Sequence, residues 1–196
     1  MPKIISISAV SAAASLTGFA SDVTGATWAL TANNSGDSLA HKLTIRNDSA
    51  TNHSAKTATV VGTGPEGQPQ TKVYSLPGVS ATITSADYWL TVTSVTPSAT
   101  IGADTMDIGW GVDSVTAWQF PSQVSPFSIG LGCVVASGTP TFTLQHSYGD
   151  GIAFPHASVT SKTANAEATY TAPVRAIRLS FAAAGGVDVT AIQAGA

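Results

Sequence analysis

Three residues of this sequence have side chains that can ligate a metal ion and lie close together along the chain: His146, Asp150 and His156. The turn-forming run Tyr148–Gly151 between them could gather two imidazoles and one carboxylate, a ligand set that suits several transition metals. Their spacing matches none of the established metal-binding motifs. We therefore interpret His146 as a strand residue that hydrogen-bonds locally and Asp150 as a turn residue. The metal site stays as the alternative.

The glycines between Gly62 and Gly67 could be taken for a phosphate-binding loop. Such a loop needs a helix directly after it, because the helix N-terminus supplies the N–H groups and the dipole that hold the phosphate. The residues that follow, Gln70–Leu76, instead alternate as in a strand, and Pro77 and Gly78 end the pattern. The glycines therefore predict a β-hairpin whose tip is Pro65–Gly67.

No other arrangement in the sequence indicates catalysis. A G-x-S-x-G motif is absent, and the only glutamates, Glu66 and Glu167, fall in a turn and in a polar linker. His41 and His53 have no cysteine or acidic residue beside them in the sequence, so we expect solvated or capping roles for both. The sequence thus predicts a protein that is not an enzyme and that needs no cofactor.

The composition limits the classes of partner. Charged residues make up 10% of the chain, against roughly 25% in an average globular protein. So weakly charged a surface favours coverage by other protein, which predicts a homo-oligomer or another assembly. The net charge of −3 and the scattered arginines argue against nucleic acid. No apolar run reaches the roughly 20 residues of a membrane span, and none is predicted.

The single cysteine and the N-terminal segment each have a simple interpretation. Cys133 lies in an apolar run, so we expect it to be buried and inert.

Residues 1–16 combine a lysine, apolar residues and small residues, as a secretory signal does. Serines interrupt the apolar residues in alternation between Ile4 and Val10, which predicts an N-terminal strand instead.

Period-two alternation runs through almost the whole chain and predicts an all-β protein. We divide it into two small β-sandwich or barrel-like domains in tandem, residues 1–112 and 113–196. The predicted strands include His41–Arg46, Tyr88–Val95, Phe127–Val135, Pro140–His146, Val174–Phe181 and Val187–Ile192. Ala182–Gly186 is predicted to be the tight turn between the last two of these strands, because two adjacent glycines can adopt positive φ.

Several of these stretches, taken in order, resemble a family of virion structural proteins of tailed bacteriophages. In the first half the similar stretches are Thr63–Thr71, Thr91–Thr96 and Asp107–Trp110, and in the second half they are Ser125–Phe127, Thr143–Ser147, Lys162–Ala166 and Pro173–Leu179. The resemblance covers most of residues 26–194. Pro65 and Lys72 stand where the family usually has acidic residues, which leaves the implied fold intact but puts a charge-based contact at the hairpin in doubt.

The resemblance implies a non-enzymatic particle component, and we expect a capsid decoration (cement) protein that binds between capsid subunits. A neck or tail component is the first alternative. Its partners would be copies of itself, the major capsid protein or neighbouring virion proteins. The contact residues we expect belong to the N-terminal strand, which could add to a neighbour's sheet edge, and to the hairpin tip: Ile4, Ile5, Ile7 and Val10, and Pro65, Glu66 and Gln68.

The four tryptophans suggest a function of another class. Exposed aromatic rings on a β-sandwich can stack on sugar rings, which would make the protein a glycan-binding attachment module. Packing in the core or in an interface is the competing interpretation of Trp28, Trp89, Trp110 and Trp118. The two interpretations differ in whether the rings are exposed.

Overall fold

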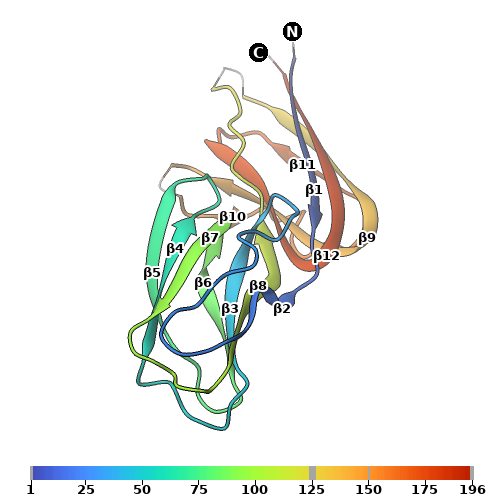
Figure 1. The fold of residues 1–196 in the computed structure, drawn as a ribbon. Coiled ribbons are helices and arrows are strands. Elements are labelled where there is room, and N and C mark those ends of the chain that lie inside the picture. Colours follow the sequence, from blue (N-terminus) through green and yellow to red (C-terminus); the bar gives the residue numbers. More distant parts are fainter. Residues whose placement is uncertain (1, 124–126, 150, 195–196) are drawn as a thin grey trace. The chain divides into compact units, whose positions relative to one another are not determined.

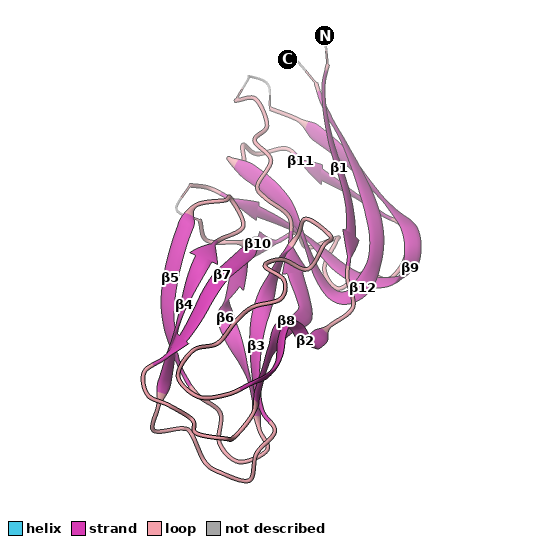
Figure 2. Ribbon diagram, in the orientation of Figure 1, coloured by secondary structure: helices cyan, strands magenta, loops and turns pink. Residues whose placement is uncertain are grey.

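The structure, a computed structural model, describes residues 2–123, 127–149 and 151–194 (Figure 1). Within these residues it contains strands and no helix (Figure 2), which confirms the all-β prediction. A helix long and apolar enough to cross a membrane is therefore not found in this part of the chain either. The strands are β1 (Lys3–Ser11), β2 (Ser15–Val23), β3 (Ala40–Asn47), β4 (Thr57–Thr63), β5 (Pro69–Ser75), β6 (Thr82–Trp89), β7 (Thr91–Pro97), β8 (Met106–Val115), β9 (Ile129–Ser147), β10 (Phe154–Pro155), β11 (Ala166–Tyr170) and β12 (Ala176–Gln193).

The chain forms two compact units, which are called here the middle unit (residues 13–114) and the terminal unit (residues 1–12 and 115–196). This division differs from the tandem domains 1–112 and 113–196 in the place of the N-terminal strand. β1 pairs along its whole length with β12, so the first residues of the chain group with the last ones. Local sequence patterns do not contain this information, because the paired residues lie about as far apart in the chain as two residues can.

Two sheets enclose the core of the middle unit. One has the order β5-β4-β7, and in the other β2 pairs with β8 and β3 pairs with β6. Alternate side chains of both sheets point inward and pack together, as in a β-sandwich. The buried cluster includes Leu43, Ile45, Met106 and Ile108 from the second sheet and Ala58, Val60, Val92 and Val95 from the first.

The hairpin predicted from the glycines is present as β4 and β5. Gly64 donates its N–H to the carbonyl oxygen of Gln68 at 2.9 Å, and Gly67 adopts a φ of 75°. The prediction of one strand over Tyr88–Val95 is wrong, since β6 ends at Trp89 and β7 begins at Thr91. β6 pairs with β3 and β7 pairs with β4. The chain passes from one sheet to the other between these strands. The alternation continues across the break because both strands direct side chains into the same core.

The terminal unit is built on two long strands, β9 and β12, which pair with each other along almost their whole length. β11 and β10 pair with the other side of β9, and β1 pairs with β12. The inward side chains of the three longest strands are buried and apolar: Ile5, Ile7 and Ala9 from β1, Ile129, Leu131, Cys133, Phe142 and Leu144 from β9, and Ile177, Leu179, Phe181, Val187, Val189 and Ala191 from β12.

The tight turn predicted at Ala182–Gly186 is wrong, because β12 continues through this segment. Figure 1 shows β9 and β12 curving together instead of reversing direction. The pairing register shifts three times between Phe181 and Val187, as expected for β-bulges. Gly185 has a φ of 146° and lies opposite Gly138, whose φ is 63°. The glycines therefore bend a continuous pair of strands, and the separate strands predicted over Phe127–Val135 and Pro140–His146 are one strand, β9.

Candidate interaction surface

The predicted contact residues of the N-terminal strand point to opposite faces of β1. Ile4 and Val10 are 63% and 55% exposed, whereas Ile5 and Ile7 are buried in the core of the terminal unit. Successive side chains of a strand alternate between faces, so half of any strand that covers a core remains outside. Only Ile4 and Val10 are thus available to a partner without unfolding the unit.

The outward face of β1 continues across β12. Ile192 is 52% exposed and lies opposite Ile4, so two large apolar side chains are neighbours on the surface. Opposite Ser8 lies Asp188, whose carboxylate accepts a hydrogen bond of 2.6 Å from the Ser8 hydroxyl. Between these pairs Ser6 lies opposite Thr190. The surface is therefore apolar at the Ile4 end and polar in the middle, where Ser8 binds its carboxylate.

Beyond β12 this face has a shallow groove of about 560 Å³. Its floor is at Gly130 and Gly132 of β9, and its sides include Thr190 and Ile192 of β12 and Glu167 of β11. A methyl group added to either glycine would meet no atom within 4 Å. The groove therefore exists because β9 lacks side chains at these two positions.

The hairpin tip places its predicted contact residues on the surface, but not all of them are available. Glu66 and Gln68 are exposed and Pro65 is half-buried. The side-chain oxygen of Gln68 accepts a hydrogen bond of 2.9 Å from the backbone N–H of Glu66. Gln68 thus stabilises the turn itself.

The residues of the predicted metal site lie in the terminal unit, with Asp150 outside the described residues. His146 packs against the rings of Tyr148, Phe154 and Tyr170, and the Tyr170 hydroxyl lies 3.3 Å from its Nδ1 atom. Burial, together with the nearby His156, lowers the pKa of His146 from its ordinary value. The group is therefore mainly an aromatic cluster around a histidine.

His156 hydrogen-bonds locally through both ring nitrogens. Nε2 lies 3.2 Å from the carbonyl oxygen of Thr169, and Nδ1 accepts the N–H of Ser158 at 3.2 Å. A histidine bound in this way holds its own loop in place. It would have to give up one of these bonds to ligate a metal ion.

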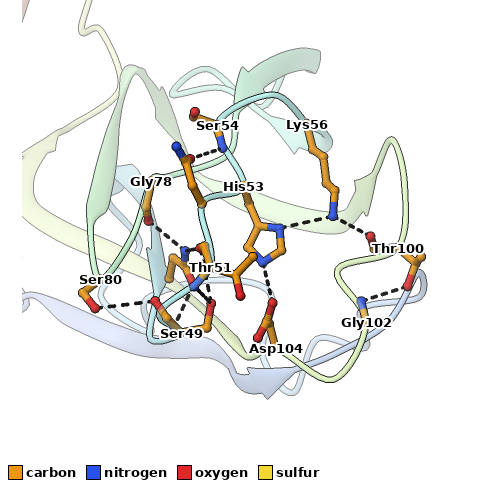
Figure 3. Close-up of polar contacts among 12 residues, drawn as sticks. Ser49, Thr51, His53, Ser54, Lys56, Gly78, Ser80, Thr100, Gly102 and Asp104 are labelled. Atoms are coloured by element: carbon orange, nitrogen blue, oxygen red, sulfur yellow. Dashed lines mark hydrogen bonds and ion pairs between the residues drawn. The ribbon is translucent and has the colours of Figure 1, made fainter.

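Solvated or capping roles were expected for His41 and His53, and the solvated role is wrong, because both rings are 2% exposed and each faces a carboxylate. His53 Nε2 lies 3.0 Å from Asp104, and its Nδ1 lies 3.2 Å from the ammonium of Lys56 (Figure 3). Since the ammonium can only donate, His53 accepts at Nδ1 and donates from Nε2 to Asp104. The partner of His53 comes from a loop about fifty positions away, which the local sequence could not indicate.

An acidic cluster in the middle unit was not anticipated from the sequence. Carboxylate oxygens of Asp22, Asp48 and Asp107 all lie within 4.8 Å of one another. The Arg46 guanidinium binds two of them, with Nε 3.0 Å from Asp48 and 3.1 Å from Asp107. The cluster is therefore an ion-pair network in which the cation is the Arg46 guanidinium.

The pKa values of this network move in opposite directions. The hydrogen bond with Asp107, with partial burial, raises the pKa of Asp48 above its usual range. Burial alone would raise the pKa of Asp107 too, but the backbone N–H of Asp22 and the guanidinium of Arg46 hold it below its usual range. Between these two carboxylates, the arrangement therefore favours the ionised form at Asp107.

The tryptophans do not form an exposed aromatic face. Trp28 and Trp89 are buried in the core of the middle unit. Trp110 is partly buried and donates its Nε1–H to the carbonyl oxygen of Ala13 at 3.0 Å. The Arg178 guanidinium lies 4.3 Å above the Trp118 ring. The described exposed aromatic rings are instead those of Phe120, Tyr148 and Phe154.

Comparisons with protein-family models, with curated proteins and with solved structures found no match to this chain.

Proposed function

We propose that this chain is a structural protein of a tailed-bacteriophage virion, present in many copies, and that it decorates the capsid by binding between capsid subunits. The virion setting comes from the resemblance of the ordered stretches in the sequence. The outward face of β1 and β12 supports the mode of action, because it offers exposed apolar contact area.

The observation that carries the proposal is the exposure of apolar side chains on a strand that also covers the core. Ile4, Val10 and Ile192 are each more than half exposed on one face of the terminal unit. Burying apolar surface contributes roughly 25 cal/mol per Å². A modest patch of this kind, repeated around a symmetric shell, stabilises the shell through the number of its copies.

The middle unit also has an exposed apolar surface. Val61 of β4 and Val73 of β5 are 37% and 61% exposed, and the register of the hairpin places them on the same face of the β5-β4-β7 sheet. Exposed valines in one unit and isoleucines in the other favour a protein with more than one contact surface. This arrangement supports an assembly role over binding through tryptophans.

The experiment that tests the proposal is the copy number of this chain in purified virions of the phage that encodes it. Quantitative mass spectrometry against the major capsid protein should give a number comparable to that protein. A count of a few copies, or about a dozen, would contradict the decoration role and place the chain in the neck or tail. Absence from the particle would contradict the structural proposal itself.

A glycan-binding role is the second candidate, and the aromatic cluster of the terminal unit is what favours it. Tyr148 and Phe154 are 59% and 42% exposed, and their ring centroids are 5.8 Å apart. Tyr148, His146 and His156 border a shallow pocket of about 310 Å³. Flat rings beside a pocket with imidazole groups suit the face and hydroxyls of a sugar.

A bacterial glycan array tests this candidate directly. If the cluster binds sugars, Tyr148→Ala should weaken binding at least tenfold, because losing one stacked ring costs more than about 1.4 kcal/mol. Phe120→Ala is the matched control, since Phe120 is also exposed but does not border this pocket. Absence of binding by the wild-type protein, or equal loss in both variants, would eliminate this candidate.

A further inference from the structure

Beyond its first residue, Lys3, the free edge of β1 lacks the features that normally keep edge strands apart. β1 pairs with β12 over nine residues without a register shift, and in the described parts of the chain no strand pairs with its other edge. Natural edge strands carry lysines, prolines or bulges that oppose pairing with another chain. From Ile4 to Ser11 β1 has no charged residue, no proline and no bulge.

The edge strand β5 of the middle unit shows the contrast. It begins at Pro69 and carries Lys72, whose ammonium lies 3.0 Å from Asp87. Both residues are of the protective kind. β1 also begins with a lysine, Lys3, but its Nζ donates to the carbonyl oxygen of Phe120 at 3.2 Å, and the stretch Ile4–Val10 that follows has no protective residue. This open stretch indicates that the edge of β1 has a partner.

The sequence of β1 identifies the partner that fits. The segment Ile4-Ile5-Ser6-Ile7-Ser8-Ala9-Val10 is nearly symmetric about Ile7. If two copies of β1 pair antiparallel with Ile7 opposite Ile7, Ile4 lies opposite Val10 and Ser6 lies opposite Ser8. Apolar residues then lie opposite apolar residues, and serines lie opposite serines. The inward face of the new pair stays apolar, and the outward face keeps serines between its apolar residues.

The neighbouring strand extends this match. On the outward face Ile192 of β12 lies next to Ile4, so the Val10 of a second copy would complete a row of three exposed apolar side chains. The row occurs twice, once on each side of the two-fold axis. Asp188 is the nearest carboxylate on this face. It already accepts a hydrogen bond from Ser8, and it lies on β12, which is not one of the two newly paired strands.

We propose that two copies of this chain associate through β1, antiparallel and centred on Ile7, so that the two terminal units share one continuous sheet. Such a two-fold contact is self-complementary and uses the same surface on both copies. The inference rests on the proposed function only in taking β1 as a contact surface, and it specifies the partner as a second copy of the chain.

The test compares three full-length proteins by sedimentation equilibrium. At about 100 µM, where a micromolar contact is populated, the wild type should be dimeric. Ser6→Lys with Ser8→Lys places lysines opposite each other in the proposed register and should weaken the dimer at least tenfold. Ser6→Glu with Ser8→Lys is the matched control, since it places opposite charges there and should restore the dimer. Thermal unfolding checks that all three proteins are folded.

A cysteine pair tests the register independently. Ser6→Cys and Ser8→Cys proteins should form a disulfide when mixed, because in this register their Cα atoms come within disulfide range, roughly 4.4–6.8 Å. The native Cys133 does not compete, since it is buried and burial raises the pKa of its thiol to about 11.

Three results would overturn the inference. These are a monomeric wild type at about 100 µM, a dimer that is indifferent to the paired lysines, and a dimer lost equally in both charge variants. A monomer in solution that is still abundant in virions would refute self-pairing alone and direct the search to a strand of another virion protein. A dimer that is absent from virions would refute the proposed function and leave self-pairing intact.

Discussion

Replacing Gly185 with alanine is expected to lower the free energy of unfolding of the terminal unit by about 2–5 kcal/mol. A Cβ atom at this position would lie 2.7 Å from Cδ of Pro140 and 2.9 Å from the carbonyl oxygen of Ser137. In addition, the φ of 146° is one that residues with a side chain rarely adopt. Steric overlap and backbone strain therefore act at the same residue.

Hydrogen exchange measured by mass spectrometry localises this effect, since faster exchange should appear in peptides from β9 and β12. Gly132→Ala is the control in the same sheet, because its Cβ would meet no atom within 4 Å and its φ is ordinary. We expect that control to change the stability by less than about 1 kcal/mol. Equal protection in the two variants would contradict the bend described for β12.

The bend also shows where prediction from the sequence ends. A pair of glycines between two alternating runs is typical of a hairpin turn and equally of a bulge. What decides between them is Gly138, some 47 positions earlier, which lies opposite Gly185 and lets both strands bend together. The strand character of the flanking residues was predictable from the sequence, whereas the continuity of β12 depends on a contact that is remote in the chain.

The N-terminal strand illustrates the same limit for the candidate surface. Alternation from Ile4 to Val10 predicted a strand, but it could not indicate that β12 would be its partner. That partner decides which residues can bind a neighbour, because it directs Ile5 and Ile7 into the core. Removing residues 1–10 would therefore damage the terminal unit as well as any assembly. Outward substitutions at Ser6 and Ser8 separate the two effects.

The middle unit offers the second large effect. His41→Ala should lower its free energy of unfolding by about 3 kcal/mol, since removing one partner of a buried ion pair leaves the other uncompensated. His41 Nε2 lies 2.7 Å from a carboxylate oxygen of Asp37, and Nδ1 lies 2.9 Å from the carbonyl oxygen of Gly111. Removing the imidazole breaks both hydrogen bonds at once.

The adjacent residue of β3 provides the control. Lys42 forms an ion pair of 2.8 Å with Asp113, but these side chains are 27% and 40% exposed, whereas those of His41 and Asp37 are 2% and 9% exposed. Exposed pairs contribute about 0–1 kcal/mol, so Lys42→Ala should cost less than 1 kcal/mol. Urea unfolding of both variants measures the difference.

Asp37 keeps hydrogen bonds from Ser35 and from the backbone of Leu39, which is why we expect the lower end of the range for buried pairs. A loss in His41→Ala no larger than that in Lys42→Ala would mean that water replaces the imidazole and that burial of the pair does not stabilise the unit.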